Sequence, residues 1–355
     1  MNRILSFTLF ILLFGSSIVV SAQKKDSLEV SGFAEVYYSK DQYAWGNHTR
    51  PDFLYNHTAS NYIALNSAVL SVDYASERIK ANISLVEGTY ANRVTSQEKQ
   101  GFGSLYSAYF TYLPFKNKKH EFRAGIFPSH IGLESAIGLQ NICLSRSLAA
   151  ENTPYYESGV SFTLKSKNEK WNASLLVLNG WQNMNKLAQE NHPSFGTQVS
   201  FQPNKDLLIN HSTFIGEVMN FDTLVNRYYQ DFYIDFQLNT KWKIQALYDI
   251  GIQSHKNNTT NYTWQTAAIM LGYRLSEQLG LGGRLEVFED PDRNIITYAA
   301  SDLLGYSVNM NYSLRKNLLF RAEFRSLHTQ NSSFQFETKQ SSMINGVNLS
   351  LAVQF

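Results

Sequence analysis

The chain has 355 residues, with 31 lysines and arginines against 29 aspartates and glutamates, so its formal net charge is +2. Charged residues make up 17%, well below the roughly 25% of an ordinary soluble protein, while 21 tyrosines and 23 phenylalanines exclude a disordered chain. Cys143 is the single cysteine, which excludes a disulfide scaffold, and the near-neutral charge gives no reason to expect nucleic acid as a partner.

Residues 1–22 have the organisation of a secretory signal peptide. Arg3 precedes an apolar run from Ile4 to Val20, and small residues then lead to a cleavage site after Ala22. The alternative is a membrane anchor, but the run is at the short limit for a span and no stop-transfer pattern follows it. We therefore expect export and a mature domain of residues 23–355, either soluble or a membrane barrel.

Sixteen segments of the mature chain alternate apolar residues with small or polar ones. A period of two places the two sets on opposite faces of a strand, and most segments have 10–14 residues, enough for a tilted strand to cross a bilayer. The predicted strands are 28–40, 61–75, 78–90, 104–115, 120–127, 154–165, 170–181, 194–203, 206–218, 228–240, 242–254, 262–275, 278–289, 302–314, 318–329 and 344–355.

The connections between these strands alternate in length. Short turns such as 76–77, 204–205 and 276–277 alternate with longer segments, an arrangement typical of outer-membrane barrels with short periplasmic turns and long external loops. A soluble sandwich has no reason for this rhythm. We therefore predict an all-β fold: a transmembrane antiparallel up-and-down β-barrel of about 16 strands. The long connections are 41–60, 91–103, 128–153, 182–193, 219–227, 255–261, 290–301 and 330–343.

The last predicted strand ends on Phe355. Its apolar residues alternate without a break from Val347 to Phe355, and a terminal aromatic of this kind resembles the assembly signal of bacterial outer-membrane barrels. We therefore expect the barrel assembly machinery and outer-membrane lipid as partners. The alternative is an edge strand of a soluble sandwich.

The first half of the chain contains several distinctive runs: FLYNH (53–57), EGTY (87–90), AGIFPSHIGLESAIG (124–138), SRSLAAENTPYYESG (145–159) and LVLNGWQ (176–182). These runs resemble the OmpL-like β-barrel porins of Gram-negative bacteria. The resemblance covers roughly residues 30–200 and implies an outer-membrane porin, without indicating its solute. We expect an aqueous channel for small polar solutes, formed by a monomer or by a homotrimer.

The longest connection, 128–153, is the candidate constriction of that channel. A sixteen-strand barrel is wide enough to hold water, and the apolar middle of this segment would be unfavourable on an exposed surface. We expect it to fold into the lumen; the alternative is a lid over the barrel mouth. Its candidate pore-lining residues are His130, Glu134, Arg146 and Glu151.

Strand parity predicts the charged side chains of the lumen wall. Arginines concentrate late in the chain and aspartates in the middle, which would set a transverse field; the alternative is that these residues form cross-strand ion pairs. Glu87 is an exception, because its parity places it on the lipid side unless it lies at a bulge or at the rim. The candidates on the wall are Arg123, Glu157, Asp231, Asp235, Asp249, Arg284, Arg321 and Arg325.

Motifs for other chemistry are missing from the sequence. There is no phosphate-binding glycine loop, no H-E-x-x-H pair and no cluster of cysteine and histidine, so we expect neither a metal nor a cofactor. Ser129 and His130 are neighbours, but nothing in the pattern sets them as a catalytic dyad. We therefore expect a protein that is not an enzyme. The open alternatives are a barrel phospholipase or protease, and a structural or adhesive barrel with a filled lumen.

Overall fold

The computed structural model describes residues 26–95, 98, 103–117, 119–220, 222–255, 260–296, 301–330, 333–337 and 339–355. The predicted signal peptide lies outside this described part. Within it, no helix is long and apolar enough to cross a membrane.

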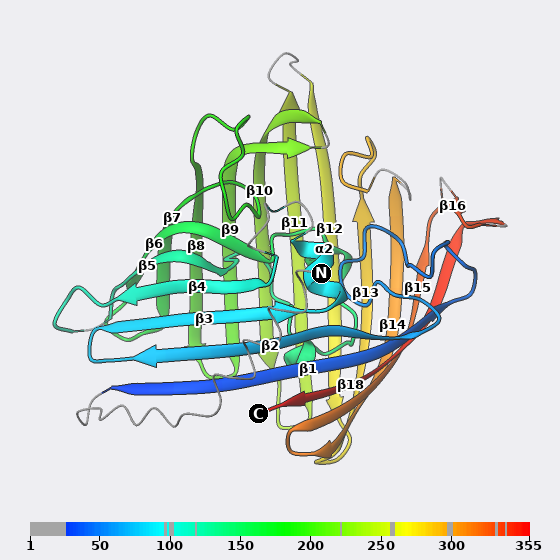
Figure 1. Ribbon diagram of the computed structural model, residues 1–355, viewed down its shortest axis with the longest axis horizontal. Helices are drawn as coiled ribbons and strands as arrows, with labels where there is room; N and C mark the ends of the chain where they lie inside the picture. The colour runs from blue at the N-terminus through cyan, green and yellow to red at the C-terminus, as the bar shows by residue number, and fades with distance from the viewer. Residues whose placement is uncertain are drawn as a thin grey trace, which may run out of the picture.

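The described residues form a closed barrel of sixteen antiparallel strands, in which each strand pairs with the next along the chain and the last pairs with the first (Figure 1). The predicted fold class is therefore confirmed, and most strand boundaries agree with the prediction to within three residues. The strands are β1 (Ser27–Asp41), β2 (Ile63–Ala75), β3 (Ile79–Glu87), β4 (Leu105–Tyr112), β5 (Glu121–Pro128), β6 (Tyr156–Lys165), β7 (Trp171–Leu178), β8 (Ser194–Asn204), β9 (Leu207–Asn220), β10 (Thr223–Gln237), β11 (Trp242–His255), β12 (Asn261–Arg274), β13 (Leu279–Glu289), β14 (Asp302–Arg315), β15 (Leu318–His328) and β18 (Met343–Gln354).

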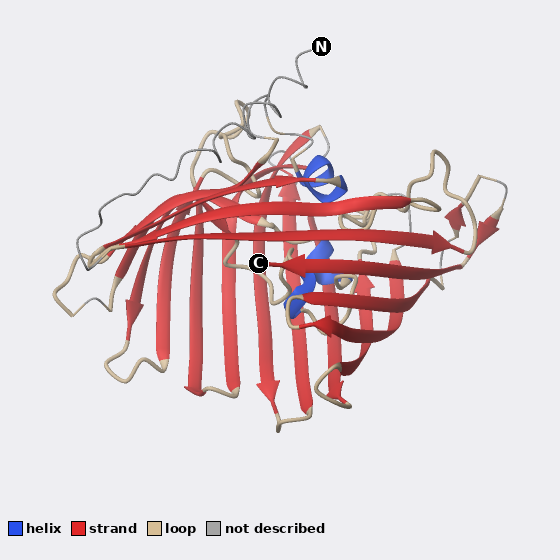
Figure 2. Cartoon of the chain, turned by 60° about the horizontal axis from the view of Figure 1, so that its bottom comes forward, coloured by secondary structure: helices blue, strands red, loops and turns tan. Residues whose placement is uncertain are grey.

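The long connections contain short elements that the sequence pattern did not predict. These are α2 (Thr89–Val94), the 3₁₀ turn η2 (Gly138–Gln140), α3 (Leu148–Glu151), and a two-stranded sheet of β16 (Phe334–Gln335) and β17 (Gln340–Ser341). The helices are blue in Figure 2; α2 packs against β2 and β3, and α3 packs against β12 and β13. We call the end of the barrel that carries these connections the long-loop end, and the other the short-turn end.

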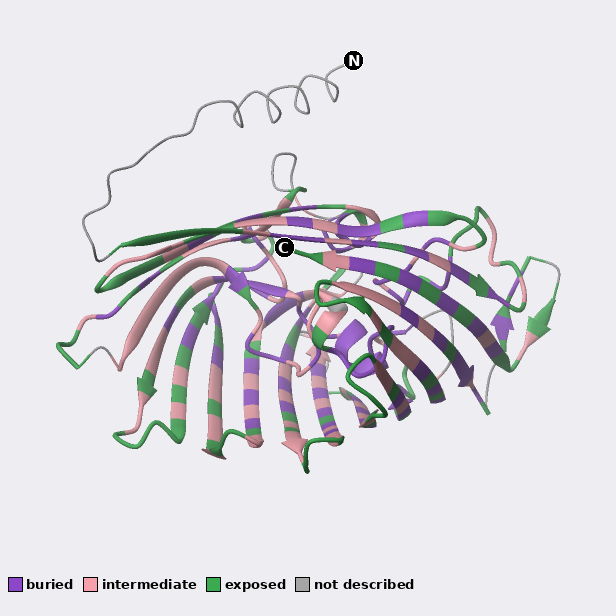
Figure 3. Ribbon diagram, turned by 90° about the horizontal axis from the view of Figure 1, so that it is seen from below, coloured by how far each residue is buried: buried purple, intermediate pink, exposed green. Residues whose placement is uncertain are grey.

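The burial pattern is the reverse of that in a soluble protein. Leu285 and Val308 point outward and are each 61% exposed, whereas their neighbours Glu286 and Ser307 point inward and are buried. Buried and exposed residues therefore alternate along many of the strands (Figure 3). Apolar side chains can face outward at no cost only where the surroundings are lipid, so this pattern places the outer surface in a membrane.

Aromatic pairs mark the outer surface near the short-turn end. Trp171 stacks on Phe201 with ring centroids 4.3 Å apart, and Trp242 lies 4.4 Å from Tyr273. Each pair joins neighbouring strands beside a short turn. Amphipathic rings favour the headgroup level, so these pairs belong to an interfacial girdle.

Phe355 closes the seam between the last and the first strand. Its backbone N–H donates to the carbonyl of Gly32 at 3.0 Å, and the N–H of Gly32 donates back at 2.8 Å. The far end of the Phe355 ring occupies the space beside Gly32 where a Cβ atom would lie.

Glu87 lies at the rim of the barrel. It ends β3 beside a register shift at Ser84 and Leu85, and it accepts a hydrogen bond from Ser104 of the adjoining loop. A carboxylate at this height avoids the hydrocarbon region, which resolves the exception to strand parity.

A charge placed on the outer face at mid-strand tests the assignment of that face to lipid. We expect Val308→Arg to lower the free energy of unfolding in phospholipid vesicles by about 2–4 kcal/mol, the cost of an arginine near the bilayer midplane. The matched control is Ser313→Arg on the inner face of the same strand, where the side chain meets the aqueous mouth. Equal losses for the two variants, measured by denaturant titration, would contradict the assignment.

Candidate functional site

The candidate site is the lumen, and the segment 128–153 runs through it. His130, just after β5, is fixed to the wall at β8 and β9: its carbonyl accepts hydrogen bonds from Gln198 at 2.9 Å and Ser212 at 2.7 Å. Its Nε2 donates to the carbonyl of Thr213 at 2.9 Å, and its Nδ1 lies 3.4 Å from Glu157. Burial opposes protonation of this ring, but the hydrogen bond and charge of Glu157 outweigh burial and raise the pKa of His130.

The segment then reaches β13, β14 and β15, which lie half-way round the strand order from β5. The N–H of Leu144 donates to Asn309 at 3.0 Å, and the carbonyl of Ser145 accepts from Arg284 at 2.6 Å. At the start of α3 the N–H of Leu148 donates to Glu286 at 2.6 Å. The segment therefore crosses the lumen from one wall to the opposite one.

The predicted arginines of this wall lie in a compensated ion cluster. Glu286 lies 3.2 Å from Arg284 and 2.7 Å from Arg325, and Glu323 lies 3.5 Å from Arg284. Glu134 of the loop approaches Arg284 at 3.9 Å and accepts hydrogen bonds from the backbone and hydroxyl of Ser147. Arg284 and Arg325 therefore form ion pairs with carboxylates of the wall and the loop.

The other loop charges, Glu151 and Arg146, share an aromatic partner. Glu151 accepts from the hydroxyl of Tyr155 at 2.9 Å, and Arg146 lies 4.2 Å from the centroid of the same ring. Both charged side chains are buried, so they act as internal partners of the packed loop.

Arg123 and Arg321 make contacts that need no loop carboxylate. Arg123 lies 5.2 Å from the ring centroid of Tyr109 and 5.6 Å from that of Phe127. Arg321 donates to the carbonyl of Asn141 at 2.9 Å, so it holds the loop through its backbone. Arg321 therefore contacts the loop through a backbone carbonyl, a partner that the charges in the sequence could not indicate.

The predicted aspartates divide between two depths of the barrel. Asp231 and Asp249 are buried and lie directly opposite each other in the register of β10 and β11, and Tyr229 donates to Asp249 at 2.8 Å. Asp235 is closer to the short-turn end and pairs with Lys243 at 3.1 Å. The structure therefore does not bring all three into one group.

A second loop, 42–62, also packs inside the barrel, which sequence reasoning missed. Arg50 is buried against Asp41 at 3.0 Å, and His57 lies 3.1 Å from Glu35 on β1. The N–H of Tyr55 donates to Glu151 at 2.6 Å, so this loop contacts the crossing segment directly. Its apolar residues gave the same signal as those of 128–153 and could have revealed it.

Apolar side chains fill much of the lumen towards the long-loop end. Phe53 and Leu148 from the two loops pack in one cluster with wall residues of β12, β13 and β15. The same cluster includes Phe334 and Phe336 of the last long connection. This interior is a packed core rather than a plain water-filled opening. The wall residues include Trp264, Phe288 and Leu327.

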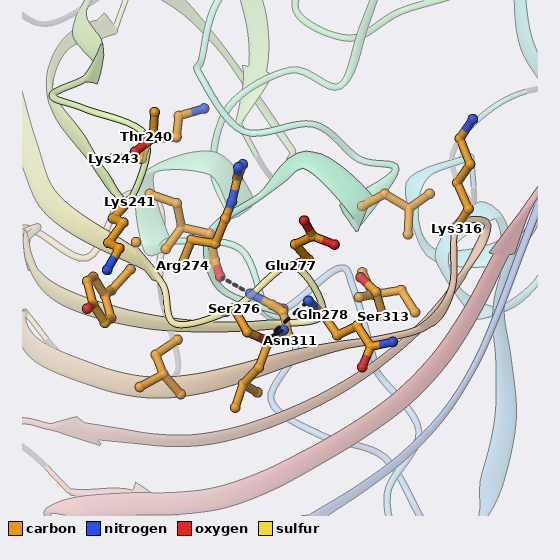
Figure 4. A pocket seen from close by; sticks show the side chains of 18 of the residues that line it. Thr240, Lys241, Lys243, Arg274, Ser276, Glu277, Gln278, Asn311, Ser313 and Lys316 are labelled. Carbon is orange, nitrogen blue, oxygen red and sulfur yellow. Dashed lines mark hydrogen bonds between the residues drawn. The ribbon is translucent and has the colours of Figure 1, made fainter.

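Cavities remain on both sides of the crossing segment. At the short-turn end a cavity of ≈ 970 Å³ lies against Leu139 and Ile142 of the segment, and a smaller one of ≈ 240 Å³ lies beside Arg123 and His130. At the long-loop end a cavity of ≈ 370 Å³ lies against Glu151 and Tyr155. Figure 4 shows the cavity of ≈ 970 Å³, whose lining includes the basic residues Lys241, Lys243, Arg274, Arg315 and Lys316.

Metal ligands and two candidate nucleophiles, Cys143 and Ser129, can be assessed in the described residues. These residues contain no group of three or more histidine, cysteine, aspartate or glutamate residues placed to hold a metal ion. Burial raises the pKa of the Cys143 thiol to about 12, so this thiol stays protonated at neutral pH. The Ser129 hydroxyl donates to Glu157 at 3.1 Å, an arrangement that does not activate it through His130.

Comparison with known proteins gives one matching family. The family model of the OmpL-like beta-barrel porin-2 proteins matches residues 27–355. No curated protein sequence matches the chain.

Outer-membrane channels and porins of low sequence identity are among the solved structures with a similar fold. The anion-selective porin from Comamonas acidovorans aligns with a TM-score of 0.64 at 10% identity, covering 93% of this chain and 100% of that one. The channel DcaP of Acinetobacter baumannii also gives 0.64 at 10% identity, covering 94% and 99%. The trimer form of OmpT of Vibrio cholerae gives 0.60 at 9% identity, covering 93% and 100%. At these identities the likeness shows the fold.

Removing Arg284 tests whether the wall cluster holds the crossing segment. Arg284→Gln leaves Glu286 and Glu323 less compensated in a buried site, so we expect the free energy of unfolding to fall by about 3–5 kcal/mol. Hydrogen exchange at the backbone of Ser145 and Leu148 should rise with it. The control Arg274→Gln removes an exposed cation and should change stability by less than about 0.5 kcal/mol. Unchanged exchange in the first variant would show that the cluster does not hold the loop.

The protonation of Glu190 should make the stability of the long connection 182–193 depend on pH. Burial raises the pKa of Glu190 to about 7, although Asn183 donates to it at 3.1 Å. A raised folded-state pKa means that the stabilising contribution is complete below the ordinary pKa and is lost as the pH rises through about 7. Hydrogen-exchange protection of this connection should therefore be higher at pH 5 than at pH 8. Glu190→Gln should remove the difference; a difference that persists would assign it to another group.

Proposed function

Since the chain belongs to the OmpL-like beta-barrel porin-2 family, we propose that it is an outer-membrane porin through which small polar solutes diffuse passively. The observation that carries the proposal is the inner wall, whose charged and polar side chains would be costly in lipid but suit an aqueous path. The crossing segment 128–153 is the proposed constriction, because cavities lie on both sides of it.

The proposal extends to the route by which the barrel reaches the membrane. Residues 1–22 would direct export and be removed, and Phe355 would engage the assembly machinery from its place at the closing seam. The exposed apolar outer face would contact lipid. A homotrimer is the proposed assembly, supported by the recorded trimer form of one structural neighbour.

A second candidate is a structural barrel without an open channel. The packed apolar cluster at the long-loop end is the observation that favours it, because such a cluster excludes water. Both candidates share the same fold and membrane, so their difference lies in conductance alone.

Single-channel recording in planar bilayers separates these two functions. We expect the purified protein to give discrete current steps. We expect a variant shortened between Gly132 and Ala149 to conduct more and to select less, because strand hydrogen bonds do not pass through this segment. The control is an unshortened protein carried through the same refolding, with heat-modifiable migration on gels to show an intact barrel. Intact barrels that carry no current in either form would exclude the porin and support the structural barrel.

A further inference from the structure

Arg227 is a buried cation near the long-loop end of the lumen. It projects inward from β10 and is 6% exposed. Its guanidinium carbon lies 4.6 Å from the ring centroid of Trp181 and 5.2 Å from that of Trp264. These cation–π contacts offset part of the cost of burying the charge, but they accept none of its N–H donors.

The polar partners of Arg227 are too few for a buried charge. Its Nη2 donates to Gln253 at 2.9 Å, while its Nε has no acceptor among the described residues. No carboxylate of the described chain forms an ion pair with it, in contrast to Arg50 and Arg284, each of which has one. Leaving a buried charge uncompensated is strongly unfavourable, so an anion that reaches this position would gain what the protein does not supply.

The position is accessible to a small ligand because Arg227 lines the cavity of ≈ 370 Å³ at the long-loop end. Three acidic side chains also line this cavity: Glu98, Glu151 and Glu190. Glu151 accepts from Tyr55 and Tyr155, Glu98 accepts from the hydroxyl of Tyr156 at 2.7 Å, and Glu190 accepts from Asn183 at 3.1 Å. None of the three forms an ion pair with Arg227.

The rest of the lining indicates the kind of anion. The aromatic side chains of Tyr55, Tyr155 and Trp181 line the cavity. The guanidinium group is a planar fork that pairs best with a planar, bidentate acceptor. A carboxylate on a flat, largely apolar body matches both features, whereas an inorganic anion would match the charge alone.

We propose that this cavity is a binding site for small organic carboxylates, in which Arg227 holds the carboxylate and the aromatic side chains hold the body of the ligand. The inference rests on the proposed porin function, because it assigns a class of solute to the entrance of the channel. It makes a prediction about binding that does not require current to flow.

The test is titration calorimetry of the detergent-solubilised barrel with sodium benzoate, at constant ionic strength set with sodium chloride. Benzamide, which has the same shape without the charge, is the matched ligand. We expect benzoate to bind at least tenfold more tightly than benzamide. Arg227→Gln should weaken benzoate at least tenfold, a loss of about 1.4 kcal/mol or more, and Arg227→Lys should restore only part of it, since the fork is lost. The control Arg274→Gln removes an exposed cation of the cavity at the short-turn end and should change binding less than threefold.

Each outcome bears on the inference. Equal binding of benzoate and benzamide, or unchanged benzoate binding in both Arg227 variants with heat-modifiable migration intact, would overturn it. If Arg227→Gln does not fold, the ratio of the two ligands and the lysine variant still decide. A barrel that binds benzoate but carries no current would support the binding site and contradict the porin function. A barrel that conducts but does not bind benzoate would contradict the binding site alone.

Discussion

The structure depends on one constraint: a backbone that crosses hydrocarbon must pair all of its own N–H and C=O groups. An open sheet would leave two unpaired edges, so the first and last strands must meet. Here they do so along β1 and β18, down to the mutual hydrogen bonds of Gly32 and Phe355. Once the sheet is closed, its outer face must be apolar and its inner face encloses a space that the strands alone cannot fill.

The long loops fill the space inside the barrel, and the side chains of the wall hold them there. Irregular backbone at membrane depth is tolerated only where protein or water satisfies it, and the wall charges supply the partners. Glu286 accepts from the backbone of Leu148 while it pairs with Arg284 and Arg325, and Arg284 donates to the carbonyl of Ser145. The buried ions thus gain extra hydrogen bonds, and the loop gains acceptors and donors. Neither part would be well compensated without the other.

Features that depend on the local period of the sequence, such as the strands, could be predicted. Contacts that depend on the register between strands could not. Two-residue alternation located the strands, and the length and apolar middle of 128–153 indicated a packed segment. Alternation of Arg284 with Glu286, and of Arg321 with Glu323, already placed opposite charges on one face. Which carboxylate meets which arginine depends on how β13 and β15 stand beside each other and on where the loop arrives, and neither is encoded locally. The packing of loop 42–62 inside the barrel could not be predicted from its length, because it is shorter than 128–153.

Charge compensation differs along the lumen, and this decides where an electric field can act. Around the crossing segment, arginines and carboxylates lie within a few ångströms of each other, so their fields cancel over a short distance. Among the described residues, several cations that form no ion pair lie elsewhere. Arg227 lies towards one end, Arg123 lies beside the smaller cavity, and Lys241, Arg274, Arg315 and Lys316 surround the cavity at the other end together with Glu277. Bulk salt screens exposed charges over about 8 Å but screens buried ones much less. The buried arginine should therefore influence a passing ion more strongly at physiological salt than the larger basic rim does.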